Sequence, residues 1–143
     1  MSRSGYSDEV DDLWELIRWR GAVASSFRGK RGQAFLREAL ETLEKMPVKE
    51  LAAYDLESPD GGFCLLGAVG KARGLELQPL NELSIEKVAN AFSIAPAMAK
   101  EIVYMNDELW KTEEPDSRWA RMRRWVASCI RKEKVDAHQA PSA

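Results

Sequence analysis

Histidine is almost absent from this sequence. The one copy among 143 residues, His138, stands close to the C-terminal end. A lone histidine at that place excludes a Ser/His/Asp triad, a Cys/His pair and a multi-histidine metal site. Glu113, Glu114 and Asp116 are close in sequence, but their stretch lacks the apolar wall that acid catalysis by a carboxyl group needs. We therefore expect a protein that is not an enzyme and that uses neither a metal nor a cofactor.

Cysteine and long apolar runs are also scarce. The two cysteines, Cys64 and Cys129, belong to no CxxC or Cys/His cluster, so we expect two reduced, half-buried thiols. No apolar run approaches the roughly 20 residues that span a bilayer. Residues 1–12 are polar and acidic, unlike a secretory signal. These absences predict a cytoplasmic protein without a membrane partner.

The composition that is present is typical of a globular protein. Hydrophobic residues make up 45% of the chain and charged residues 31%. A length of 143 residues suits one domain that can fold without disulfides. We expect a flexible N-terminus over residues 1–6, a single helical domain over residues 7–132 and a disordered tail over residues 133–143.

The spacing of apolar residues predicts a mainly α fold, a compact bundle of about five to six helices. Residues 51–57 fit either a helical turn or a strand. Because a clear turn follows at residues 58–62, a small β-hairpin near residues 51–66 stays open as an alternative. Residues 75–83 predict a loop. Helices are expected over residues 8–27, 33–46, 64–73 and 117–132, with two short helices within residues 84–106.

Residues 84–106 have the spacing of a helix-turn-helix unit. Ala89 and Ser93 stand where such units place a small residue and a turn residue. The second helix of the pair would expose Lys100 beside Glu101, and two further acids follow. Base reading uses Arg, Lys, Asn or Gln, and acids oppose the approach of phosphate. The stretch therefore fits a helix-turn-helix in spacing, while its side chains favour a plain helical corner.

The net charge of −2 conceals a strong segregation of charge. Residues 16–37 contain six basic residues and no acid, and residues 118–134 contain seven basic residues and one acid. Trp125 follows Arg121 by four residues on a predicted helix, where the two side chains can stack. Either segment can instead be a solvated turn or helix face. The candidate binding-surface residues are Arg28, Lys30, Arg31, Lys100, Arg118, Arg121, Arg124 and Trp125.

Four stretches of extended sequence carry a family resemblance: residues 17–36 (IRWRGAVASSFRGKRGQAFL), 64–74 (CLLGAVGKARG), 88–107 (VANAFSIAPAMAKEIVYMND) and 118–130 (RWARMRRWVASCI). The chain resembles a family of small proteins encoded by phages and prophages of Gram-negative bacteria. The resemblance implies a context, a phage product inside an infected or lysogenic bacterium, and no site residues.

Two functions from different classes follow as expectations. The first is a binding protein that contacts a protein of the bacterial host, such as a defence complex, and inhibits it by occupancy. The second is a nucleic-acid-binding regulator that uses the two basic segments as phosphate contacts and residues 84–106 as a helix-turn-helix.

Overall fold

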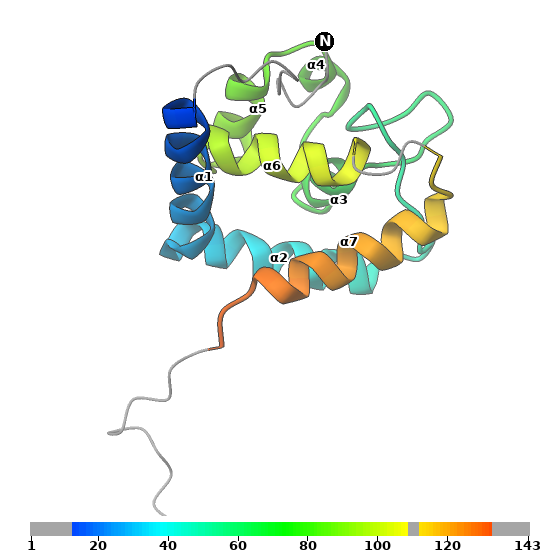
Figure 1. Cartoon of the computed structure of the whole chain (residues 1–143). Helices are drawn as coiled ribbons and strands as arrows, with labels where there is room; N and C mark the ends of the chain where they lie inside the picture. The colour runs from blue at the N-terminus through cyan, green and yellow to red at the C-terminus, as the bar shows by residue number, and fades with distance from the viewer. Residues whose placement is uncertain (1–12, 109–111, 133–143) are drawn as a thin grey trace, which may run out of the picture.

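The computed structural model describes residues 13–108 and 112–132, which form a compact bundle of helices (Figure 1). This confirms the predicted mainly α fold. The described residues form one more helix than the predicted five to six. This helix, α4, is a single turn inside the loop predicted for residues 75–83. The helices of the described residues are α1 (Leu13–Arg28), α2 (Lys30–Lys45), α3 (Leu65–Ala72), α4 (Gln78–Asn81), α5 (Ile85–Phe92), α6 (Pro96–Asp107) and α7 (Pro115–Cys129). The predicted end segments, residues 1–6 and 133–143, lie outside the described residues.

Helices α1 and α2 meet in a corner made by one residue, Gly29. Its backbone is extended (φ −65°, ψ 160°), and its carbonyl accepts the N–H of Gln33 at 2.9 Å. Helix α2 therefore begins three residues before the predicted start at Gln33. Gly32 lies inside α2 and does not break the helix. The Ser26 carbonyl approaches Gly32 closely at this corner. A Cβ at Gly32 would stand 1.9 Å from that oxygen.

Helix α6 is the centre of the bundle. It packs against α1, α3, α5 and α7, and Figure 1 shows it running through the middle of the molecule. The corner between α5 and α6 is as predicted: Ser93 adopts a left-handed conformation (φ 59°) that ends α5, and the Ile94 N–H donates to the Ala89 carbonyl at 3.1 Å. The turn satisfies the carbonyls at the end of α5 and aims α6 back into the core.

Helices α2 and α7 run antiparallel as the base of the bundle. Near one end the indole N–H of Trp119 donates to the Leu43 carbonyl at 3.1 Å, and near the other the side-chain amide of Gln33 donates to the Cys129 carbonyl at 3.0 Å. The buried side chains of α7 are Met122 and Val126 from the apolar stripe, together with Arg118. Helix α7 ends three residues before the predicted boundary at residue 132.

The segment over residues 51–64 is neither a helix nor a full hairpin. One antiparallel bridge joins Glu57 to Phe63, and the side chain of Asn81 clamps the segment by accepting from the Leu56 N–H and donating to the Glu57 carbonyl. Backbone hydrogen bonds also cross between the two flanks, from the N–H groups of Ala52, Ser58 and Cys64 to the carbonyls of Phe63, Gly62 and Leu56. The hairpin alternative is therefore found in reduced form, as two flanks that are joined by one bridge and a few backbone hydrogen bonds and that form no extended strands.

Helix α3 begins against the same segment. The Sγ atom of Cys64 accepts the Gly67 N–H at 3.4 Å, and a Cβ at Gly67 would stand 1.7 Å from the Leu56 carbonyl oxygen. Cys64 and Cys129 form no disulfide. Cys129 is half-buried, as predicted for both thiols, whereas Cys64 is fully buried.

Helix α1 lies at the periphery. Its side chains over residues 17–28 are all half-buried or exposed. It is fastened to α6 through Lys100, whose ammonium lies 5.4 Å from the ring centroid of Trp19. Among the helices of residues 13–108 and 112–132, none has the length and apolar character needed to cross a bilayer.

Candidate functional site

One end of the bundle gathers exposed cations from both basic segments of the sequence. The α1–α2 corner and the C-terminal end of α7 lie side by side there (Figure 1). We name this surface the basic end. Its exposed residues are Arg28, Lys30, Arg31, Arg37, Arg131 and Lys132.

Gln33 is the residue that joins the two segments. Its side chain is 7% exposed. The amide nitrogen donates to the carbonyls of Phe27 (2.7 Å) and Cys129 (3.0 Å), and the amide oxygen accepts the N–H of Arg131 at 2.8 Å. One buried amide therefore ties together the end of α1, the start of α2 and the end of α7, with its polar groups satisfied.

Two further contacts support the basic end. The guanidinium of Arg37 donates to the carbonyl of Arg131 at 3.0 Å, which holds the chain after α7 against α2. Beneath the cations, Phe27 and Trp125 pack edge to face with ring centroids 5.7 Å apart. Trp125 is thus half-buried between helices, where it stabilises the corner. It does not form the predicted stack with Arg121.

The cations of the basic end are not neutralised within the described part of the chain. None of the six side chains forms an ion pair with a described residue. Six like charges on one surface create a positive potential that attracts an anionic partner and repels cationic ones.

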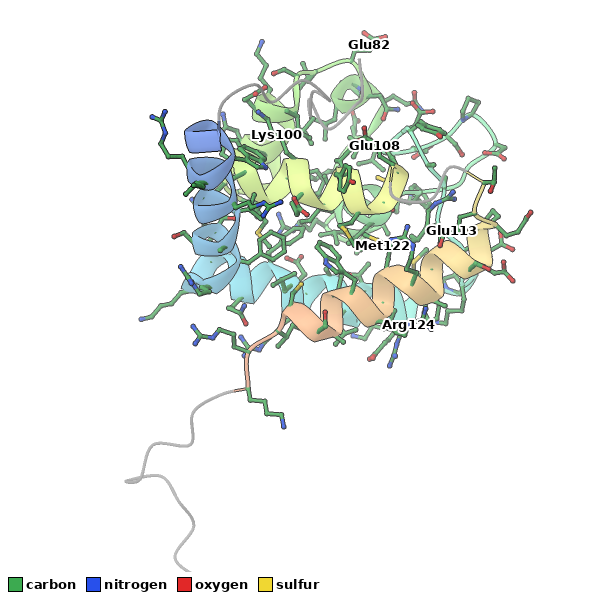
Figure 2. All side chains as sticks on the ribbon, viewed as in Figure 1. Glu82, Lys100, Glu108, Glu113, Met122 and Arg124 are labelled. Carbon is green, nitrogen blue, oxygen red and sulfur yellow. The ribbon has the colours of Figure 1, made fainter. Side chains whose placement is uncertain are left out.

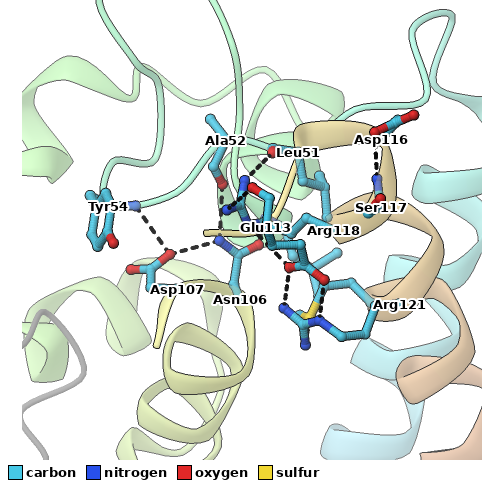
Figure 3. Close-up of polar contacts among 12 residues, drawn as sticks. Leu51, Ala52, Tyr54, Asn106, Asp107, Glu113, Asp116, Ser117, Arg118 and Arg121 are labelled. Atoms are coloured by element: carbon cyan, nitrogen blue, oxygen red, sulfur yellow. Dashed lines mark hydrogen bonds and ion pairs between the residues drawn. The ribbon is translucent and has the colours of Figure 1, made fainter. Parts of the chain in front are cut away.

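Arg118 and Arg121, predicted as surface cations, are instead part of the internal structure (Figure 3). Arg118 is 6% exposed and donates to the carbonyls of Leu51 (2.8 Å) and Glu113 (3.1 Å). Arg121 grips the Glu113 carboxylate with two hydrogen bonds of 2.7 and 2.8 Å. The two guanidinium groups bind the carbonyl of Leu51 and the carbonyl and carboxylate of Glu113, and so hold these residues against α7. Neither arginine belongs to the basic end.

The same region contains a second buried polar group that fixes the irregular segment. Asn106 donates to the Ala52 carbonyl at 3.0 Å and to the Asp107 carboxylate at 2.7 Å, and Asp107 accepts the Tyr54 N–H at 3.1 Å. Both side chains are 2% exposed. Tyr54 has φ 77° and is 59% exposed. The tether from Asp107 stabilises a left-handed conformation that tyrosine rarely adopts.

Lys100 and Arg124 lie apart from the basic end. Lys100 forms an ion pair with Glu86 at 3.2 Å and contacts Trp19, so it fastens α1 to the α5–α6 corner. Arg124 is exposed on the outer side of α7, and Figure 2 shows the two residues on different sides of the molecule. Of the eight predicted residues, the structure brings Arg28, Lys30 and Arg31 together.

Helix α6 is not presented as a recognition helix. Pro96 is exposed, but every later residue of α6 is buried or half-buried, and α1 packs along the helix. A helix covered in this way cannot enter a DNA groove. The helix-turn-helix spacing of residues 84–106 therefore has a structural role.

Sequence reasoning did not select Arg37, Arg131, Lys132 or Gln33 as site residues. The three cations belong to the basic segments, but nothing local indicates that the segments meet. Gln33 has no sequence signal beyond its place after two glycines. Within the described residues there is no group of three or more His, Cys, Asp or Glu side chains placed to hold a metal ion.

Comparisons with protein-family models, with curated proteins and with solved structures found no match. The function must therefore be argued from the geometry of the basic end.

Proposed function

We propose that this chain is a non-enzymatic binding protein, encoded by a phage or prophage, that acts in the bacterial cytoplasm by protein–protein contact. In this proposal the basic end docks on an acidic surface of a host protein and inhibits it by occupying that surface. The observation that carries the proposal is the union of two basic segments by Gln33 into one exposed surface without ion pairs to described residues.

The chemistry of the basic end suits an acidic protein surface. Arg28, Arg31, Arg37 and Arg131 can each bind a carboxylate with two parallel hydrogen bonds, and arginine is enriched among the residues that dominate binding energy. The backbone of Arg31 and Arg37 is fixed by the α2–α7 packing, which lowers the entropy cost of association. The covered position of α6 removes the element that would read bases.

The basic end also supports a second candidate, a protein that binds the nucleic-acid backbone. Cations without internal ion pairs are what phosphate contact requires, and such contact is independent of sequence. The two candidates differ in their response to salt, because counterion release makes nucleic-acid affinity fall steeply between about 50 and 200 mM salt.

A pull-down from host lysate with matched charge variants tests the proposal. The double variant Arg28→Glu, Arg31→Glu should lose the captured protein by about tenfold or more, since two favourable contacts become repulsive. The control Lys87→Glu, Arg124→Glu changes the net charge equally at exposed sites elsewhere and should capture as the wild type does. Equal losses in both variants would contradict the proposal.

Titration with a short DNA duplex and its RNA counterpart separates the second candidate. At about 50 mM salt, we expect the wild type to bind neither nucleic acid more tightly than the Arg28→Glu, Arg31→Glu variant does. Nucleic-acid binding that is sensitive to salt and is lost in the double variant, together with an empty pull-down, would show that the partner is nucleic acid and not a protein.

A further inference from the structure

A groove lies between α2 and α3, on a surface that the basic end does not use. Its volume is about 540 Å³, within the range of roughly 300–1,000 Å³ that ligand pockets occupy. Apolar atoms line most of it, contributed by Met46 and Pro47 after α2, by Phe63 and by the small residues Ala68 and Ala72 of α3. The small residues leave the groove open.

Apolar surface continues beyond the groove. Val48, which follows the groove residue Pro47, is 60% exposed. Exposed apolar surface beside a hollow is typical of places where another molecule binds. The α2 wall of the groove runs from Glu38 to Lys45, eight residues or about 12 Å, which is close to two turns of a facing helix.

The charges at the edge of the groove determine which charge on a bound molecule would be favourable. Glu38 is neutralised by Arg73, with hydrogen bonds of 2.5 and 2.8 Å, and Glu41 pairs with Lys45 at 2.5 Å. Lys71, on the α3 edge, forms no ion pair with any residue that the structure describes. The uncompensated charge at the groove is therefore positive, as it is at the basic end.

We propose that this groove binds the apolar stripe of a short amphipathic helix whose flanking residues are acidic. A helix laid in an apolar groove makes its contacts through residues at i, i+3, i+4 and i+7. Two turns of such a stripe match the α2 wall, and an acid beside the stripe pairs with Lys71 on the α3 edge. The inference rests on the proposed function, because it assigns the helix to the same acidic protein partner.

The test measures the binding of two synthetic peptides to the full chain by fluorescence anisotropy. The first is an amphipathic peptide of about four turns with leucines at helical spacing and glutamates beside them. The second is a scrambled peptide of the same composition. Because both carry the same charge, a difference between them reports the groove and not general attraction to cations. We expect the scrambled peptide to bind at least about tenfold more weakly.

Three variants of the chain locate the binding. Ala72→Trp fills the groove from an exposed position and should weaken the first peptide by about tenfold or more. Lys71→Glu should weaken it by about fivefold, since an attractive pair becomes repulsive. Arg28→Glu, Arg31→Glu should change it by less than about twofold, because the basic end is a separate surface. Circular dichroism of each variant confirms the fold.

Each other outcome decides against one of the two proposals. Equal binding of the two peptides, or full binding by Ala72→Trp, overturns the groove proposal and leaves the basic end untouched. Loss of the peptide by Ala72→Trp, together with host capture that survives in the basic-end variant, keeps the groove and overturns the proposed function. A wild-type dimer that Ala72→Trp makes monomeric in sedimentation shows that a second copy covers the groove, which also overturns the inference.

Discussion

The side chain of Gln33 donates a hydrogen bond of 3.0 Å to the carbonyl of Cys129, 96 residues further along the chain. The bond lies beneath the basic end and closes the antiparallel pair of α2 and α7. This one amide therefore contributes both to the stability of the bundle and to the shape of its candidate binding surface.

Gln33→Leu should destabilise the protein and disperse the basic end. The substitution keeps the volume but leaves the carbonyls of Phe27 and Cys129 and the N–H of Arg131 without partners, at a cost of about 1–3 kcal/mol in the free energy of unfolding. Urea denaturation measures the loss. Gln78→Leu, at an exposed position of α4, is the control and should stay within about 0.5 kcal/mol. A Gln33 variant as stable as this control would show that the amide does not close the base.

Two helical glycines should respond to alanine in opposite directions. Gly32→Ala forces a Cβ against the Ser26 carbonyl, 1.9 Å away, so we expect a loss of about 1–3 kcal/mol. Gly21→Ala meets nothing within 4 Å and should stabilise α1 by about 0.5–1 kcal/mol. Thermal denaturation of the two variants in the same buffer compares them. Equal shifts would contradict the tight corner between α1 and α2.

Arg118→Ala should cost far more stability than Arg124→Ala on the same helix. Removal of Arg118 leaves the carbonyl of Leu51 and the carboxylate of Glu113 buried with fewer partners, which costs about 3 kcal/mol or more. Arg124 is exposed and its loss should stay within about 0.5 kcal/mol. Denaturant titration measures both. Similar values would place Arg118 at the surface after all.

Cys129 should react with alkylating reagents more slowly than an exposed thiol at neutral pH. Burial raises the pKa of Cys129 above its usual value near 9, the hydrogen bond from Ser128 opposes the rise, and the charge of Glu101 adds to it. The reactive thiolate therefore forms only at higher pH. Mass spectrometry after iodoacetamide treatment should show a rate that still climbs above pH 9. A plateau below that pH would contradict the raised pKa.

The same shift has a consequence for folding stability. The pKa of Cys129 is higher in the folded chain than in the unfolded chain, so the folded state keeps its proton longer as the pH rises. The stability that this thiol contributes is complete below the unfolded pKa and is lost as the pH passes through the folded pKa. Cys129→Ser should remove this loss of stability at alkaline pH. In the alkylation experiment, Cys64 is 1% exposed and should stay unmodified in the folded protein.

Local signals predicted the helices, and contacts between distant residues decided the site. The α5–α6 corner was predictable because its caps, turn residue and apolar stripe lie within about 20 residues of one another. The burial of Arg118 was not predictable, because it depends on a hydrogen bond to the carbonyl of Leu51, 67 residues earlier in the chain. Without knowledge of that partner, a cation on a helix is expected to face solvent. The covering of α6 by α1 is equally a long-range event. The basic segments were visible in the sequence, and their meeting at Gln33 was not.

The peripheral position of α1 has a consequence for the motions of the molecule. Over residues 17–28 no side chain is fully buried, and a single extended residue, Gly29, links the helix to α2. Elements with few buried contacts open at a lower free energy than the core. Backbone amides of α1 should therefore exchange with deuterium sooner than those of α2 and α6. An opening of α1 about Gly29 would change the spacing between Arg28 and the cations after α7, and a partner that holds both would slow that exchange.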